Sequence, residues 1–193
     1  SSRPDHEYAP LYTSDDLTNG WSVLWQWNHE PHLELIACDD AGLAITTDRL
    51  AGDCTEAINT LSQRCLGPKM SAEITVDGSG LHEGDHTGIC ALMGCFSELG
   101  LTRTAEGFAL SLITREDAHA PYAIAPATEP VCERARVAVP GSTVRLRADF
   151  DFTRDTVQMS WLDGAAWQPV GQPHQLVYRL DHFMGCRVGL FTY

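Results

Sequence analysis

The sequence predicts an all-β protein, an antiparallel β-sandwich of the jelly-roll type. Apolar and polar residues alternate with a period of two in several segments, and an Asp-Gly pair separates two such segments. No segment shows a 3.6-residue apolar period with helix caps. Roughly a dozen short strands separated by turn signals are typical of a sandwich in which each strand buries one face.

The expected strands follow from these patterns in chain order. Near the N-terminus they cover residues 21–29, 42–47 and 57–66, and Gly67-Pro68 stops the last of them. Strict alternation then marks residues 70–76, 144–152 and 157–161. Asp163-Gly164 predicts a hairpin turn toward Trp167. Further strands are expected at residues 87–92, 98–103, 107–114 and 187–192.

Length and composition favour one compact domain, with residues 1–13 as a polar linker and residues 14–193 as the sandwich. The formal net charge of −13 disfavours nucleic acid and anionic membranes as partners. No apolar run approaches the ~20 residues that span a bilayer, and the N-terminus lacks the shape of a signal peptide. Seven cysteines without a C-x-x-C pair favour free thiols and a reducing compartment, which predicts a cytoplasmic location.

The stretch Trp25-Gln26-Trp27-Asn28-His29 mixes large aromatic side chains with amides and an imidazole. Aromatic faces stack on the C–H faces of sugars, while amides bond sugar hydroxyls, so the stretch suits carbohydrate contact. In the alternative, the two tryptophans share a buried face and the polar residues are solvated.

Two motifs for hydrolysis occur in one short loop. His82-Glu83-Gly84-Asp85-His86 matches the H-E-x-x-H zinc motif, which requires a helix, but Gly80, Gly84 and Gly88 predict a turn instead. Glu83-x-Asp85 begins the E-x-D-x-E pattern of sandwich glycosidases, yet Thr87 and Gly88 occupy the places of the second Glu. An enzyme acting alone is therefore disfavoured, and a glycosidase that uses Glu83 or Asp85 is kept as an alternative.

No cofactor is expected apart from a structural calcium ion, which jelly-roll sugar-binding domains commonly hold. The candidate ligands are the acidic pairs Asp15-Asp16, Asp39-Asp40 and Asp149/Asp151. In the alternative, each pair is a solvated turn or the outer face of a strand.

Five spaced blocks carry a family resemblance. They are Asp15-Asp16-Leu17, Leu24-Trp25-Gln26-Trp27-Asn28-His29-x-Pro31, Asn59-Thr60-Leu61-Ser62-Gln63-Arg64-x-x-Gly67-Pro68, Gly84-Asp85-x-x-Gly88, and the tail from His182 to Phe191. In this order they resemble the C-terminal β-sandwich module of glycoside hydrolase family 43, of the β-xylosidase and α-arabinofuranosidase type. The resemblance covers residues 14–193 and implies a concanavalin A-like sandwich.

The resemblance implies a non-catalytic accessory domain, because the catalytic residues of such enzymes sit in an N-terminal five-bladed propeller. The implied partners are that propeller and a xylan- or arabinoxylan-type oligosaccharide. The implied contact residues are Trp25, Trp27, His29, Asn59, Gln63, Arg64 and Asp85. In this scheme Asp85 fixes Gln63 and Arg64, or else forms with Arg64 a buried ion pair that only stabilises the sandwich.

Three departures from the family pattern stand out. Glu30 replaces an Asn, Cys186 replaces an aromatic residue, and the chain ends at Tyr193, where family members continue into a last strand. The last departure predicts an unpaired sheet edge or a missing tail. A purely structural domain without sugar affinity remains a third hypothesis.

Overall fold

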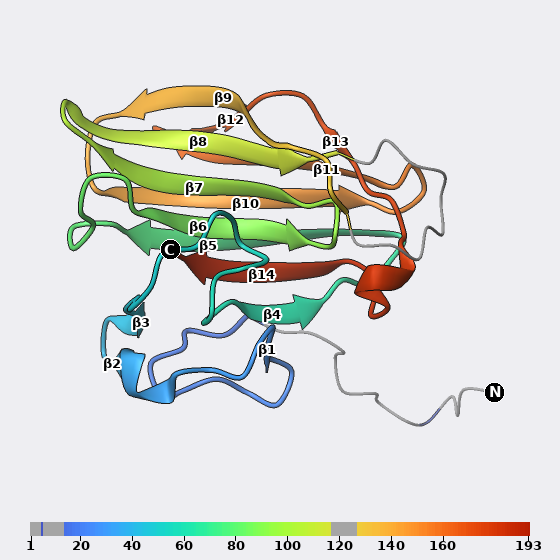
Figure 1. Cartoon of the computed structure of the whole chain (residues 1–193), viewed down its shortest axis with the longest axis horizontal. Helices are drawn as coiled ribbons and strands as arrows, with labels where there is room; N and C mark the ends of the chain where they lie inside the picture. Colours follow the sequence, from blue (N-terminus) through green and yellow to red (C-terminus); the bar gives the residue numbers. More distant parts are fainter. Residues whose placement is uncertain (1–4, 6–13, 117–126) are drawn as a thin grey trace.

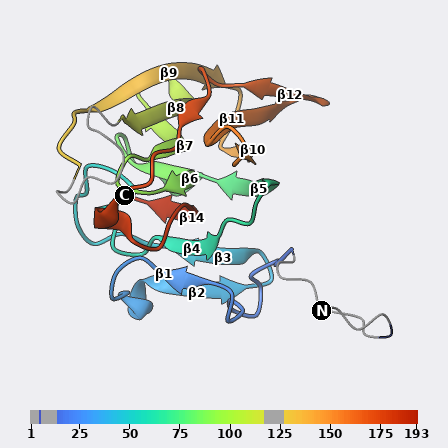
Figure 2. The ribbon, with the colours of Figure 1, turned by 90° about the vertical axis from the view of Figure 1, so that its right-hand side faces the viewer.

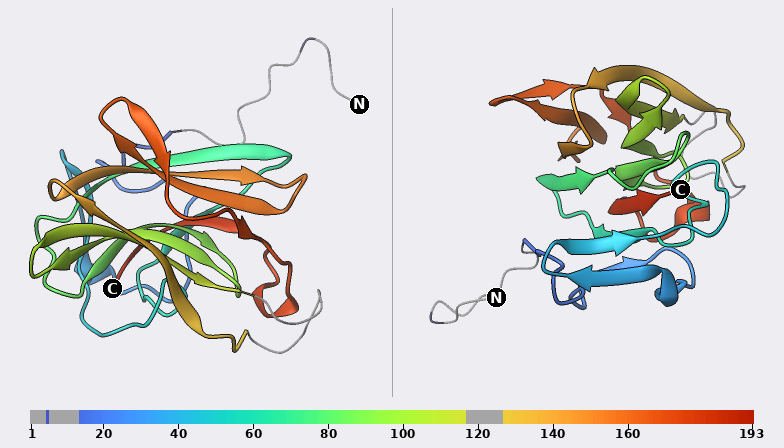
Figure 3. Two further views of the ribbon diagram at one scale, coloured as in Figure 1. Left: turned by 90° about the horizontal axis from the view of Figure 1, so that it is seen from above. Right: turned by 90° about the vertical axis from the view of Figure 1, so that its left-hand side faces the viewer.

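Two antiparallel sheets pack face to face in the computed structural model, which describes residues 5, 14–116 and 127–193. Figure 1 shows the strands of both layers running across the molecule, and the left view of Figure 3 separates the layers. Apart from Asp5, the predicted linker at residues 1–13 lies outside the described residues.

The larger sheet has seven strands in the order β1-β4-β14-β6-β7-β8-β9. Their bounds are Gln26–Trp27 (β1), Leu61–Arg64 (β4), Arg187–Thr192 (β14), His86–Leu92 (β6), Ser97–Thr104 (β7), Gly107–Arg115 (β8) and Val131–Val139 (β9). The C-terminal strand β14 thus lies between β4 and β6, which separates two segments that are close in sequence.

The smaller sheet has the order β12-β11-β10-β5, with β13 also paired to β11. Its strands are Ala166–Pro169 (β12), Thr156–Asp163 (β11), Thr143–Asp151 (β10), Lys69–Asp77 (β5) and His174–Gln175 (β13). Within the described residues β5 forms one edge of this sheet, paired only to β10.

A separate hairpin, Ile36–Asp39 (β2) with Gly42–Ile45 (β3), lies beside β1 at one side of the sandwich (Figure 2). The helical residues form two short 3-10 turns, Leu33–Leu35 (η1) and Leu180–His182 (η2). In the described part of the chain, no helix is long and apolar enough to cross a lipid bilayer.

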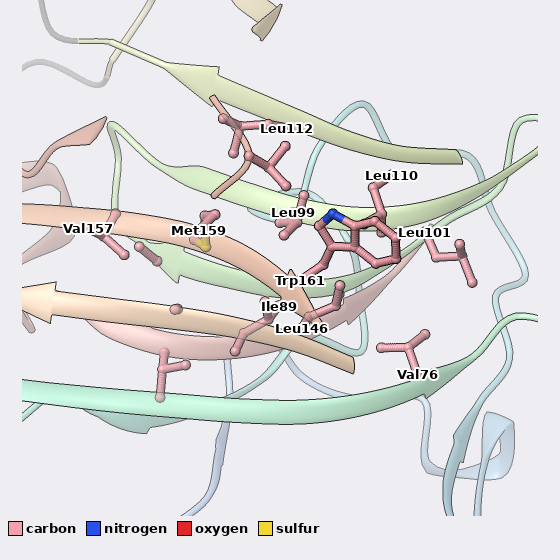
Figure 4. Packing of buried hydrophobic residues seen from close by; sticks show 14 of the residues in the cluster. Val76, Ile89, Leu99, Leu101, Leu110, Leu112, Leu146, Val157, Met159 and Trp161 are labelled. Carbon is pink, nitrogen blue, oxygen red and sulfur yellow. The ribbon is translucent and has the colours of Figure 1, made fainter. Parts of the chain in front are cut away.

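The main core lies between the sheets because alternate residues of each strand point inward. Ile89, Leu99, Leu101, Leu110 and Leu112 of the larger sheet meet residues of the smaller sheet, and Figure 4 shows Val76, Leu146, Val157, Met159 and Trp161 among them. The residues between these positions, such as Cys90, Glu98, Gly100 and Ser111, lie on the other face of the larger sheet. We call this the outer face.

The outer face is partly covered, which the strand pattern did not predict. Cys54, Cys90, Leu92, Phe96 and Phe191 form a second buried apolar cluster there. The loop that carries Cys54 is held over the sheet by the Thr60 hydroxyl, which donates to the Cys54 carbonyl at 2.9 Å. Polar residues beneath this loop are therefore shielded from water.

The fold prediction is confirmed, and most strands from residue 70 onward match their predicted ranges. The strand predicted at residues 21–29 is wrong, since only β1 is regular, and the strand at residues 57–66 shrinks to β4. Residues 53–60 form turns because the buried Thr60 and Asn59 side chains bond loop backbone instead of following a strand. Strands β2 and β9 were not predicted, although Ala135, Val137 and Val139 in β9 do alternate with the exposed residues Arg136 and Ala138.

Candidate functional site

The two predicted contact tryptophans lie at the β1 side of the sandwich and are half-buried. Trp27 in β1 meets Trp21 edge to face, with ring centroids 5.1 Å apart. Trp25 lies just before β1, and its indole N–H donates to Asp15 Oδ2 at 3.1 Å. Both rings are therefore engaged with other parts of the N-terminal segment, which limits the flat surface that they offer to a sugar.

His29 and Asn59 hold the same segment to the loop before β4. The exposed His29 ring pairs through Nε2 with the Thr55 carbonyl at 2.7 Å. Asn59 is 1% exposed, and its amide clamps the backbone of His32, accepting from the His32 N–H at 3.0 Å and donating to the His32 carbonyl at 3.3 Å. In this position Asn59 orders the loop and is hidden from a ligand.

Gln63 and Arg64 lie at the far end of β4, and Asp85 lies in the turn before β6. Arg64 is opposite Arg187, whereas the residue after Asp85 pairs with Tyr193. Because Arg187 and Tyr193 are six residues apart along an extended strand, Arg64 and Asp85 are separated by roughly 20 Å along the strand direction. The predicted contact of Asp85 with Gln63 and Arg64 is therefore wrong, because β14 inserts between the strands that carry them.

Asp85 instead closes its own turn. Its carboxylate accepts from the His82 N–H at 2.7 Å and lies 3.5 Å from His82 Nδ1. The two histidines of the H-E-x-x-H string differ in environment, since His82 is exposed and His86 begins β6 and is buried. A turn and a strand replace the helix that this zinc motif requires.

The acidic pairs proposed as calcium ligands bond neighbouring groups. Asp16 accepts from the Thr18 N–H and hydroxyl, and Asp39 accepts from the Ala41 N–H at 2.8 Å. Asp151 pairs with Lys69 at 2.9 Å. No cluster of three or more metal-binding side chains occurs among residues 14–116 and 127–193.

The most unusual polar group of the described chain is Glu98, which lies fully buried on the outer face. Its Oε2 accepts from the Cys54 N–H at 2.8 Å, and its Oε1 accepts from the Tyr193 hydroxyl. The His86 Nε2 atom lies 3.9 Å from Oε1, which is too long for a hydrogen bond. Glu98 therefore ties the loop of residue 54 to the end of the chain.

Burial shifts the pKa values of both Glu98 and His86. Loss of water raises the pKa of Glu98 to about 7, although the Tyr193 and Cys54 hydrogen bonds act in the opposite direction. Loss of water lowers the pKa of His86 to about 4. At neutral pH the imidazole is therefore uncharged, and Glu98 is close to the midpoint of its titration.

A buried ion pair stands beside Glu98 under the same loop. Asp53 is 2% exposed and receives Arg115 Nη2 at 2.9 Å, together with the Thr55 N–H at 2.8 Å. The Arg115 guanidinium also lies over the Phe96 ring, 5.3 Å from its centroid. The covered part of the outer face thus combines an apolar cluster with a paired carboxylate and guanidinium, although Arg115 Nε has no hydrogen-bond partner.

Comparison with known proteins gives the family. The β-xylosidase C-terminal concanavalin A-like domains of glycoside hydrolase family 43 match residues 17–193. The chain belongs to this family. Among curated proteins, none matches the domain significantly.

Solved structures with the same fold are family 43 enzymes. A bifunctional GH43-CE protein of Bacteroides eggerthii is 27% identical, with a TM-score of 0.80 over 93% of the domain and 24% of that protein. A GH43 glycoside hydrolase engineered to display both endo-xylanase and exo-arabinofuranosidase activity is 20% identical, with a TM-score of 0.83 over 99% of the domain and 39% of that enzyme. A xylan β-1,4-xylosidase from Bacillus halodurans C-125 is 15% identical, with a TM-score of 0.69 over 98% of the domain and 38% of that enzyme. The domain thus spans about a quarter to two fifths of the enzymes it matches.

The departures from the family pattern lie at defined places in the domain. Glu30 is exposed. A hydrogen bond between the Cys186 and Cys65 thiols, together with burial, raises the pKa of Cys186. All seven cysteines of the domain are free thiols. The Tyr193 backbone bonds His86 in both directions, at 2.7 and 2.9 Å, so the last residue is paired in the larger sheet.

Sequence reasoning missed the polar residues at the covered outer face, where Asp53, His86, Glu98 and Ser111 are buried and Arg115 and Tyr193 are half-buried. A signal was present in the small residues Gly88, Cys90 and Gly100, which share that face with Glu98. Small residues on a sheet face leave room for a loop to pack over that face. The hydrogen bond from the Cys54 N–H to Glu98 shows that a loop does so here.

Gly100 leaves the space that the His86 ring fills. A methyl group at residue 100 would lie 2.5 Å from His86 Nε2 and within 2.8 Å of two ring carbons. Gly100→Ala is therefore expected to lower the free energy of unfolding by about 1–3 kcal/mol through overpacking, measured by urea denaturation. Gly80→Ala is the matched control, since a methyl group there meets nothing within 4 Å. Equal stability of the two variants would contradict this packing.

Proposed function

We propose that this domain is a non-catalytic accessory module of a family 43 glycoside hydrolase of the β-xylosidase or arabinofuranosidase type. It supports the degradation of xylan or arabinoxylan by packing on a catalytic propeller, by contacting sugar, or by both. The observation that carries the proposal is the family match over residues 17–193. In the three solved relatives described above, the matched region is 24 to 39% of the enzyme, which leaves room for a separate catalytic domain.

An exposed apolar patch supports docking on another domain. Phe183 and Met184, in the turn between η2 and β14, are 77% and 58% exposed. They border a hollow of about 590 Å³ whose lining also includes Arg64, Leu66 and Phe152. Adjacent large apolar side chains around a hollow favour a protein interface over a freely solvated surface.

Sugar contact through the predicted residues has narrower support. Trp25, Trp27 and His29 stay at least partly accessible at the β1 side, whereas Asn59 is buried. The Gln63 and Arg64 side chains make no hydrogen bond or ion pair with other described residues, and Arg64 borders the apolar hollow. These two side chains are therefore assigned to the docking surface in our proposal, and the tryptophans to sugar contact.

The sugar-binding arm is tested by calorimetric titration of the chain with xylohexaose and soluble arabinoxylan. We expect saturable binding that weakens at least tenfold in Trp27→Ala and less than threefold in Trp27→Phe, because a phenyl ring keeps part of the stacking surface. Circular dichroism shows whether each variant is folded. Equal binding by both folded variants would remove Trp27 from the sugar contact.

The docking arm is tested by analytical ultracentrifugation of the chain with a family 43 catalytic domain that lacks its own sandwich. Phe183→Ser is expected to weaken the complex at least tenfold, because a large apolar anchor is lost. Leu50→Ser is the matched control, since Leu50 is fully exposed on a different loop. A folded chain that binds neither xylan-type sugar nor the catalytic domain would overturn the proposed function.

The chain alone is expected not to hydrolyse aryl β-xylosides or aryl arabinofuranosides. Glu83 is exposed, Asp85 accepts a hydrogen bond within its own turn, and the sequence lacks the second Glu of the sandwich-glycosidase pattern. Turnover by the pure chain that is lost in Asp85→Asn would establish a glycosidase instead.

A further inference from the structure

Two cysteines lie against each other where β4 meets β14. Cys65 directly follows β4, and Cys186 directly precedes β14. The outermost registered pair of these antiparallel strands is Arg64 with Arg187, so Cys65 and Cys186 are the next residues directly opposite each other. The Cys65 N–H donates to the Cys186 carbonyl at 3.4 Å, and the two thiols are hydrogen-bonded to each other. The strand register therefore sets this thiol pair.

A tight turn brings Cys186 to its place in the pair. Gly185 has a φ of +73°, a left-handed conformation that glycine adopts at little cost. The Gly185 N–H donates to the His182 carbonyl at 3.2 Å, which closes the turn between η2 and β14. The backbone, and not only a side-chain rotamer, thus positions the Cys186 thiol.

The geometry of the pair suits a disulfide bond. Directly opposite residues of antiparallel strands have Cα atoms about 4.5–5.5 Å apart, and their side chains point to the same face of the sheet. A disulfide requires Cα atoms about 4.4–6.8 Å apart. Cys65 and Cys186 both pack against the main core, as a shared face requires. The bond can therefore form without a rearrangement of the strands.

The pair is open to a small reagent. Both cysteines are half-buried, and both border the hollow of about 590 Å³ beside Phe183. Arg64 belongs to the same lining, so an anionic reagent meets a cation there. A second hydrogen-bonded thiol pair, Cys54 with Cys90, is 0% exposed. That second pair has the same kind of contact but no access to a reagent.

We propose that Cys65 and Cys186 are a modification site, at which a low-molecular-weight disulfide such as oxidised glutathione converts the two thiols into a disulfide bond. The thiolate of one cysteine attacks the reagent, which forms a mixed disulfide and releases one reduced thiol. The second cysteine loses its proton and attacks the protein sulfur of the mixed disulfide, which releases the second reduced thiol. The protein pair is thereby oxidised by two electrons, and the reagent is reduced by two.

The bond would join the end of β4 to the turn before β14. It closes a loop that runs from residue 65 to residue 186, and a disulfide that closes a long loop restricts the unfolded chain strongly. It also ties the turn that carries Phe183 and Met184 to the neighbouring strand. In a reducing compartment the pair stays as two thiols, and the bond forms where a low-molecular-weight disulfide accumulates.

The proposal is tested on the folded, unaltered chain with oxidised glutathione at pH 8.5, because exchange needs a thiolate and the pKa of Cys186 is raised. Unreacted thiols are then alkylated in urea, and peptides are mapped by mass spectrometry without reduction. We expect a Cys65–Cys186 crosslink that dithiothreitol reverses, whereas Cys54 and Cys90 are recovered as alkylated thiols. The midpoint of thermal unfolding should rise by roughly 5–15 °C in the crosslinked chain.

Cys186→Ser removes one partner, and Cys132→Ser is the matched control, since Cys132 is also half-buried but lies in β9. Cys186→Ser should carry glutathione on Cys65 without a rise of the thermal midpoint. Cys132→Ser should form the crosslink as the unaltered chain does. Glutathione attached singly to Cys65 or Cys186 of the unaltered chain, or a crosslink that forms only in urea, would overturn the proposal. Either result would leave the proposed function intact, because sugar contact and docking do not depend on these thiols.

Discussion

Arg115→Met is expected to lower the free energy of unfolding by about 3–5 kcal/mol, the cost of leaving a buried charge without its partner. Asp53 is 2% exposed, and Arg115 Nη2 is the cation that it contacts, at 2.9 Å. Methionine retains an apolar stem of similar length, so the loss reports on the guanidinium, which contacts both Asp53 and the Phe96 ring. Urea denaturation at pH 7 measures the difference.

Arg136→Met is the control for this substitution. Arg136 also pairs with a carboxylate, Glu133 at 2.7 Å, but the two side chains are 50% and 37% exposed. Exposed pairs contribute about 0–1 kcal/mol, so this variant should remain close to the unaltered chain. An Arg115→Met variant no less stable than Arg136→Met would show that Asp53 is reached by water and that the loop over the outer face is open in solution.

Glu98→Gln is expected to become more stable relative to the unaltered chain as pH rises, by up to about 3 kcal/mol between pH 4.5 and 8. Burial raises the pKa of Glu98 from 4.5 to about 7. Between these values the folded chain holds a proton that the unfolded chain has lost, so stability falls as pH rises and levels off above 7. Glutamine does not ionise and escapes this loss; about 2.5 pKa units correspond to roughly 3 kcal/mol.

The titration of His86 changes the free energy of unfolding with pH in the opposite direction, over an overlapping pH range. Burial lowers its pKa from 6.5 to about 4, so the unfolded chain binds the extra proton and stability rises with pH between these values. The two effects oppose each other up to about pH 6.5, which is why the variant must be compared with the unaltered chain at each pH. Thermal or urea unfolding at pH 5, 6, 7 and 8 gives this difference.

Ser97→Ala serves as the control for the pH series, because residue 97 precedes Glu98 and does not titrate. Its difference from the unaltered chain should be the same at every pH. A Glu98→Gln difference that is equally constant would mean that Glu98 titrates as it does in water, contrary to its burial under the Cys54 loop.

The sequence predicted well wherever the deciding interactions are local. Alternation in residues 70–76, 144–152 and 157–161 identifies half-buried strands, because a period of two follows from strand geometry alone. Spaced motifs, such as the one that contains Asn59 and Arg64, were sufficient to predict the family. The family match over residues 17–193 confirms that prediction. Predictions for residues 21–29 were less accurate, because contacts within the N-terminal segment replace most of the expected strand pairing. The Trp25 indole donates a hydrogen bond to Asp15, and the Trp27 ring packs on Trp21.

The candidate site was predicted only in part. The resemblance selected Asn59, which turned out to clamp the His32 backbone, and it joined Arg64 with Asp85, which lie at opposite ends of the sheet. It gave no role to Glu98, whose environment is made by Cys54 and Tyr193, residues 44 and 95 positions away. Strand alternation assigns Glu98 to a face but cannot indicate what covers that face.

The amino-acid sequence by itself thus determined the sandwich, its core-facing residues and its family, because these follow from local periodicity and from ordered motifs. Only the tertiary structure decided which polar residues are buried, which carboxylates find a partner, and which side chain fills the space that Gly100 leaves. The physical reason is that burial and pairing depend on contacts between distant segments, such as Asp53 with Arg115 and His86 with Tyr193. Such contacts arise when β14 enters the sheet between β4 and β6 and the loop of residue 54 closes over its outer face.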